Sequence, residues 1–221
     1  MVLLVMKLFK LPLLLLTTFL LTTISSYTFS GISPPSGMEW SKSQSELKRS
    51  GLKLSDCKSA LGGDIQYCDV TGHDKPISFA ESYTVYFIKG YGLHKVLVSG
   101  KNITGDAYGS EGKASYSKIL SSLNKKYPEE DGYESASYEW IARELYKDSD
   151  EFYECLRYDG CGNWSSYING GDDINLGNFS VELEGLSRGT GYLSLTYESP
   201  NWGEYLDVVK NQESSRDDEA L

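Results

Sequence analysis

Two stretches of the chain carry the pattern of antiparallel β-hairpins, and this pattern constrains the fold more than any other feature of the sequence. In residues 179–183 and 193–197, apolar side chains alternate with polar ones, as in strands with one buried and one open face. The segment 185–191 between them is glycine-bounded and short enough for a hairpin connection. Residues 82–99 form a second such pair around Gly90-Tyr91-Gly92, and the first of its strands is apolar or aromatic on both faces.

Helical signals lie before, between and after these hairpins. Ser43 and Glu46 form a capping box, and the apolar spacing from Tyr116 to Tyr127 fits one helix face that Pro128 ends. The predicted helices cover residues 43–50, 113–127, 136–147, a turn after Ser149, and 202–209; further strands are predicted at 65–70 and 164–168. Because β-α-β alternation is absent, we predict an α+β fold: a mainly antiparallel sheet built from two hairpins, with two or three helices packed on one face.

The first 26 residues have the pattern of a secretory signal peptide. Lys7 and Lys10 precede an apolar stretch, and small polar residues follow at 22–26. The uninterrupted apolar stretch of about 14 residues is shorter than the roughly 20 that span a bilayer, so cleavage is favoured over retention as an anchor. We therefore predict a signal peptide (1–26), an N-terminal arm (27–40), a single α+β domain (41–210) and an acidic disordered tail (211–221).

Four cysteines, Cys57, Cys68, Cys155 and Cys161, remain after such cleavage. An even number in an exported chain favours disulfides, and hence the periplasm or the cell exterior. Three pairings are possible, of which the clustering in sequence favours the local ones. Zinc binding is the alternative, but the pairs lack the usual CxxC spacing and neither histidine would complete a cluster.

The charge of the chain is uneven along its length. The net charge is −10, yet residues 128–221 contain 6 basic and 22 acidic residues and so carry −16. Like charge disfavours nucleic acid and anionic membrane surfaces as main partners. The acidic half is either a soluble face with a tail or a surface that binds a cationic partner. We predict that this partner is a basic protein.

Three short segments resemble small exported bacterial α+β proteins of unknown function. They are Pro35–Leu47 followed by Gly51-Leu52, then Leu123–Tyr127, and finally Leu195-Thr196-Tyr197. Members of this group often have glycine after the tryptophan, where this chain has Ser41. The resemblance implies an exported α+β domain of the bacterial envelope and transfers no catalytic residue.

Catalytic motifs are weak in this sequence. His73 is a candidate general base, whereas His94 fits a packed strand residue, and no GxSxG elbow is present. Gly109–Lys113 lacks the first glycine and the final hydroxyl of a phosphate loop, so we interpret it as the segment that leads into a helix. Acidic clusters could supply glycosidase carboxylates, and the loop 159–173 could supply calcium ligands, but neither has a defining spacing. We predict no metal and no cofactor.

Aromatic residues are the remaining candidates for binding. Four tryptophans and 17 tyrosines are more than a core of this size requires, and such residues dominate binding surfaces. The candidate binding residues are Trp40, Trp164, Trp202, Asp172 and Asp173. We therefore expect an exported, non-enzymatic protein that binds another macromolecule, for example an inhibitor or immunity-like protein of a basic enzyme. The alternatives are an envelope hydrolase that uses His73 or an acidic pair, and a structural or adhesive surface component.

Overall fold

A computed structural model describes residues 31–220 apart from 74, 143, 145–147 and 171–175. The signal-peptide prediction and the candidates Asp172 and Asp173 therefore lie outside the described residues. Within them, all strands belong to one sheet in the order β1-β2-β3-β4-β9-β8-β7-β6, with β5 pairing the end of β9. The strands are β1 (Lys53–Ala60), β2 (Ile65–Gly72), β3 (Ala80–Ile88), β4 (Gly92–Gly100), β5 (Ile103–Thr104), β6 (Glu134–Ile141), β7 (Gly162–Asn169), β8 (Asn178–Ser187) and β9 (Thr190–Glu198).

Every neighbouring pair of strands is antiparallel, which confirms the predicted α+β class. The sheet consists of two four-stranded meanders, β1–β4 and β6–β9, joined edge to edge at β4 and β9. Its α-helices are α1 (Gln44–Arg49), α2 (Ser110–Lys126), α3 (Phe152–Arg157) and α4 (Trp202–Ala220). Single 3₁₀ turns lie at Leu61–Gly63, Glu129–Asp131 and Ser149–Glu151. The capping box that starts α1 is present, with the Ser43 N–H donating to Glu46 at 2.8 Å.

The predicted helix over 136–147 is wrong in its first half, because residues 134–141 form strand β6. The helical interpretation rested on Tyr138, Ile141 and Leu145, a spacing that covers little more than two turns. The competing signal was an alternation in which Tyr138 and Trp140 share one face, as they do in the register that pairs them with Ser165 and Asn163 of β7. Residues 134–141 form a strand rather than a helix because they pair with β7 along its whole length.

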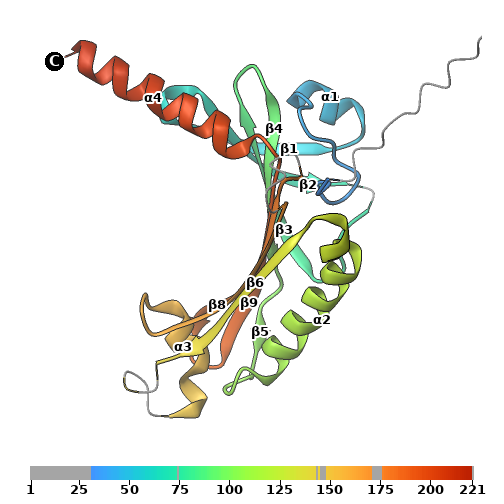
Figure 1. The fold of residues 1–221 in the computed structure, drawn as a ribbon, viewed down its shortest axis with the longest axis vertical. Coiled ribbons are helices and arrows are strands. Elements are labelled where there is room, and N and C mark those ends of the chain that lie inside the picture. Colours follow the sequence, from blue (N-terminus) through green and yellow to red (C-terminus); the bar gives the residue numbers. More distant parts are fainter. Residues whose placement is uncertain (1–30, 74, 143, 145–147, 171–175, 221) are drawn as a thin grey trace, which may run out of the picture.

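The sheet is bent, with α2 on the outer side of the bend and α4 on the inner side (Figure 1). Helices therefore occupy both faces, where one face was expected. One apolar cluster fills the outer side, between the sheet and the N-terminal arm, α1, α2 and α3. Alternate residues of β8 and β9 supply its centre: Phe179, Val181, Leu183, Leu193, Leu195 and Tyr197. The arm joins this cluster through Ile32 and Met38, both nearly fully buried.

Two glycines allow α3 to approach the β8–β9 hairpin closely. A Cβ on Gly185 would lie 1.8 Å from the Tyr153 carbonyl oxygen, and one on Gly191 would lie 2.2 Å from the Tyr153 ring. Tyr153 is fully buried and donates its hydroxyl hydrogen to Asp106 at 2.9 Å. These contacts pack α3 tightly against the outer face at the β8–β9 hairpin.

Helix α4 covers part of the inner face. Trp202 and Val209 of α4 form a second apolar cluster with Ile65 and Ile88 at the ends of β2 and β3. The helix continues to Ala220, through the segment that we expected to be a disordered tail. None of the helices that the structure describes has the length and apolar content needed to span a bilayer.

Both disulfides of the structure are local, as the spacing favoured. Cys57–Cys68 joins β1 to β2, and Cys155–Cys161 joins α3 to the residue just before β7. All four sulfurs are therefore used, and none is left to bind zinc. Two disulfides are compatible with folding in an oxidising compartment.

Candidate functional site

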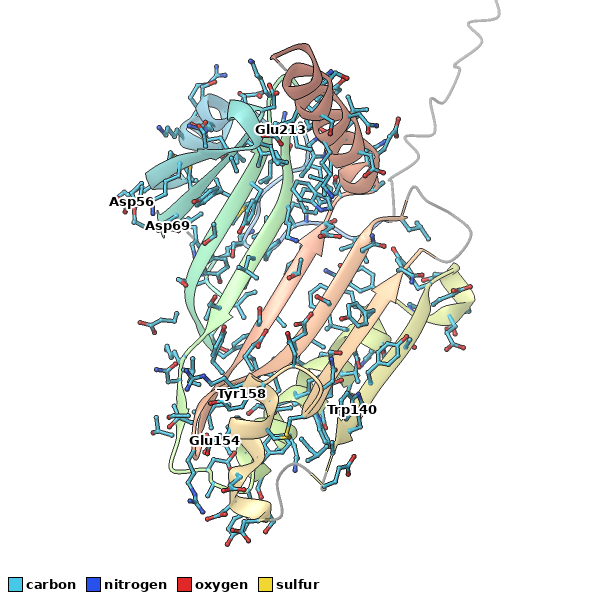
Figure 2. All side chains as sticks on the ribbon, turned by 90° about the vertical axis from the view of Figure 1, so that its left-hand side faces the viewer. Asp56, Asp69, Trp140, Glu154, Tyr158 and Glu213 are labelled. Carbon is cyan, nitrogen blue, oxygen red and sulfur yellow. A yellow bond between two sulfur atoms is a disulfide. The ribbon has the colours of Figure 1, made fainter. Side chains whose placement is uncertain are left out.

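The inner face of the sheet is open where α4 ends. Figure 2 views this face, with α4 across its upper part, α3 at its lower end and strands without a covering helix between them. A hollow of about 820 Å³ lies there, formed by residues of β4, β6, β7, β8 and β9. Its lining residues are Lys95, Ala136, Tyr138, Asn163, Ser165, Tyr167, Ile168, Asn169, Asn178, Phe179, Ser180, Glu182, Thr196 and Glu198. It is larger than the cavities of about 520 and 450 Å³ elsewhere on the described residues, which makes it the leading candidate site.

Strand alternation explains why this hollow is polar. The residues of β8 and β9 that lie between the buried apolar positions face inward across the bend, and the register places Ser180 beside Thr196 and Glu182 beside Ser194. The next strand continues these rows, because Ser165 pairs with Glu182. A single residue pattern therefore builds the apolar core on one side and a polar surface on the other.

Three exposed aromatic side chains border the polar surface. Tyr138, Trp140 and Tyr167 are 53%, 44% and 41% exposed, although most aromatic residues of this chain are packed. Tyr138 and Tyr167 meet edge to face with ring centroids 5.9 Å apart. Trp140 lies on edge strand β6 (Figure 2) and shares the inner face with Tyr138. Such clusters of exposed aromatics are typical of binding surfaces.

The charged groups of this face are mainly acidic. Burial, followed by repulsion from and hydrogen bonding to Glu182, raises the pKa of Glu184 above its usual range. Glu198 lies 2.9 Å from Lys95, the one basic residue among those lining the hollow, so these two charges neutralise each other. The Glu182–Glu184 pair is left as a concentration of negative charge beside the aromatic residues.

The tryptophans singled out from the sequence lie elsewhere and are packed. The Trp40 indole donates to the Ile32 carbonyl at 2.7 Å and so holds the N-terminal arm. Trp164 contacts Phe152 at 5.5 Å between ring centroids, on the outer side of the sheet. Trp202, the first residue of α4, is buried against Ile65 and Ile88. None of the three lines the hollow.

The two histidines lie outside the hollow as well. The His73 ring meets Tyr83 edge to face at 4.4 Å, and its Nδ1 is buried with no hydrogen-bond partner among the described residues. His94 is 2% exposed and contacts Ser199 through Nδ1 at 2.5 Å and the Tyr91 carbonyl through Nε2 at 3.1 Å. Although this resembles a base–nucleophile pair, Ser199 is also 2% exposed, so the contact fastens the segment between β9 and α4 to β4.

The residues before α2 serve to start the helix. The Asp106 carboxylate accepts the backbone N–H of Gly112 and the hydroxyl of Tyr153, both at 2.9 Å. These hydrogen bonds lower the pKa of Asp106 against the opposing effect of burial. A carboxylate therefore already occupies the position that a phosphate would take at this helix end. Across the described part of the chain, no three His, Cys, Asp or Glu side chains are grouped to hold a metal ion.

Comparisons with protein-family models, with curated proteins and with solved structures find no match to this chain. The resemblance to small exported bacterial proteins therefore stays a prediction. The aromatic residues of the hollow were missed at the sequence level because Tyr138 was assigned to the buried face of a helix. The alternation of Tyr138 and Trp140 with Ser137 and Glu139 was the signal that could have located them.

Proposed function

We propose that this protein is exported and binds a basic protein through the hollow on the inner face of its sheet. One observation carries the proposal: an uncovered hollow of about 820 Å³ combines polar side chains with the exposed rings of Tyr138 and Tyr167, and the exposed Trp140 lies beside it on the same face. Solvent alone requires polar residues on an open sheet face but does not require exposed tyrosine and tryptophan side chains. The rings would supply contact area, and hydrogen bonds to the polar groups would fix the orientation of the partner.

The charge of the site favours a cationic partner. Glu182 and Glu184 hold negative charge on the inner face, and residues 128–221 together carry −16. A basic partner would be attracted over a distance and would relieve the repulsion between the two carboxylates when it binds. The disulfides Cys57–Cys68 and Cys155–Cys161 support a place of action outside the cytosol.

The geometry of the acidic pair gives less support to a hydrolase. Glycoside hydrolysis requires carboxyl groups at least about 5 Å apart, on either side of the bond that breaks. The side chains of Glu182 and Glu184 instead lie close enough to interact directly, which contributes to the raised pKa of Glu184. Such a pair suits the binding of one ammonium or guanidinium group.

A site-specific cross-link tests the proposal. Tyr167 is replaced by the photo-reactive p-benzoylphenylalanine in the full chain, and the exposed Tyr108, which lies outside the hollow, is replaced in the control. After irradiation in the producing cells or their medium, the Tyr167 variant alone should capture a protein with a basic surface. Capture of the same species from both positions would contradict a specific site. Capture by the Tyr167 variant of the chain itself would favour a structural role.

Binding of the purified partner then gives the decisive measurement. Trp140→Ala or Tyr138→Ala should weaken binding about 30-fold if the ring is a hot spot, whereas Tyr108→Ala should change it less than about 2-fold. Glu182→Lys should slow association about 10-fold at low salt, an effect that salt removes. The proposal is wrong if Trp140→Ala and Glu182→Lys leave binding unchanged. Saturable binding of a neutral polysaccharide that Trp140→Ala abolishes would replace the protein partner with a glycan.

A further inference from the structure

A second cavity, of about 520 Å³, lies on the opposite face of the sheet from the hollow. It is bounded by α2, by the segments 77–79 and 101–103, and by β9. Leu193 and Leu195 of β9 form its floor, while Thr196 on the same strand lines the hollow. The two cavities are therefore separated by the sheet, and a ligand in this one is independent of the proposed function.

The cavity is lined mainly by large apolar side chains. Ile119 of α2 faces it from one side, and Phe79 and Ile103 from the other, above the leucine floor. Ile119 belongs to the apolar series of α2, but this helix packs on β8 and β9 and leaves a gap toward the ends of β3 and β4. Apolar side chains that surround a gap open to solvent are costly, and they are typical of ligand sites.

The rim of this cavity is basic in a strongly acidic chain. Lys101 and Lys118 line it, both exposed, and neither forms an ion pair with any carboxylate that the structure describes. Glu111 is the single acidic residue of the lining, so the lining carries a net charge of +1 while the chain carries −10. At one end lies Tyr197, whose pKa is raised by burial and by the neighbouring Tyr127 and Tyr83, so its hydroxyl stays protonated.

We propose that this cavity binds an amphiphile of the fatty-acid class, a single hydrocarbon chain with one carboxylate. The hydrocarbon chain would lie on Leu193 and Leu195, where it removes apolar surface from water. The carboxylate would remain at the rim and pair with Lys101 or Lys118. A cavity of about 520 Å³ lies within the range that small-molecule sites occupy.

Titration with cis-parinaric acid, a fluorescent fatty acid, tests this site on the full mature chain. Saturable binding with one ligand per chain is expected, and palmitic acid should displace the probe. Hexadecanol, which has the same chain length but no charge, should displace it about 10-fold less well because it forms no ion pair with the lysines. Absence of saturable binding would overturn the proposal, and equal displacement by the alcohol would overturn the role of the lysines.

Three variants of α2 locate the site. Ser115→Trp should fill the cavity and weaken probe binding at least about 10-fold. Lys118→Glu should weaken it about 5-fold, whereas Lys125→Glu, which makes the same charge change outside the lining, should alter it less than about 2-fold. Because position 118 is exposed, its variant remains informative if Ser115→Trp does not fold. Binding that is unchanged in both cavity variants would place the probe elsewhere and refute the site.

Discussion

The two halves of the sheet are built alike on the outer face but differ on the inner face. Each half is a four-stranded meander, and both contribute to the same outer apolar cluster. On the inner face, the β1–β4 half presents Ile65, Tyr86 and Ile88 to α4, which covers them. The β6–β9 half has serine, threonine, asparagine and glutamate at such positions, and α4 does not cover it.

This difference distinguishes residues that the stability of the fold explains from residues that it does not explain. Apolar residues under α4 and polar residues in the hollow each match their surroundings, so both follow from burial alone. The exposed rings of Tyr138, Trp140 and Tyr167 do not follow from burial. The binding of a partner, as proposed above, would account for them.

The largest expected effect is a contrast between neighbouring residues of β8. Leu183 is 3% exposed in the outer cluster, so Leu183→Ala should lower the free energy of unfolding by about 2–5 kcal/mol. Glu182→Ala, one residue away but facing the hollow, should change it by about 0.5 kcal/mol or less. Urea unfolding followed by circular dichroism measures both. Similar losses in the two variants would show that the inner face is also part of the core.

Removal of the disulfides compares the two halves. Cys57 and Cys68 are 11 residues apart, and Cys155 and Cys161 are 6 apart. Loop-closure entropy therefore predicts losses of about 3 kcal/mol for Cys57→Ala/Cys68→Ala and about 2 kcal/mol for Cys155→Ala/Cys161→Ala. Thermal unfolding of each double variant beside the parent chain tests the order. A larger loss for the short loop would mean that Cys155–Cys161 acts through the packing of α3 rather than through chain entropy.

The fold could be predicted where local signals were strong. The capping box before α1, the apolar series of α2 and the alternation of β8 and β9 each depend on residues close in sequence. The strand β6 could not be assigned, because its residues are nearly all exposed and only its pairing with β7 fixes it. Edge strands generally depend on tertiary context in this way.

The candidate site was less predictable than the fold. Its residues come from five strands, so no spacing in the sequence marks it. Trp40, Trp164 and Trp202 were chosen by residue type, but each packs in the interior or against the N-terminal arm. Residue type predicts that some aromatics bind, whereas only the arrangement of strands decides which of them are exposed.

A hydrogen bond that is lost in acid is expected only in the half that α4 covers. Burial lowers the pKa of His94, whose neutral ring accepts the Ser199 hydroxyl at Nδ1 and donates to the Tyr91 carbonyl at Nε2. Because the unfolded chain then binds the proton more readily than the folded chain, stability should fall as the pH falls below about 6.5. Loss of this buried hydrogen bond should cost about 1–3 kcal/mol. Hydrogen exchange of α4 at pH 7.5 and 5.5 measures it, and His94→Gln should flatten the dependence. Equal protection of α4 at both pH values in the parent chain would contradict this expectation.

The smallest effect is expected on the open half, and it has the opposite sign. Since the pKa of Glu184 is raised in the folded chain, folding binds protons there, and stability should fall as the pH rises through the folded pKa. Glu184→Gln removes the repulsion with Glu182 and should stabilise the chain at pH 7 by less than about 1 kcal/mol, with little change at pH 4. Urea unfolding at the two pH values measures this gain. The same variant should weaken binding of a basic partner, since the negative charge that costs stability would attract that partner. A stability gain without any loss of binding would mean that the acidic pair is tolerated by the fold but is not used by the site.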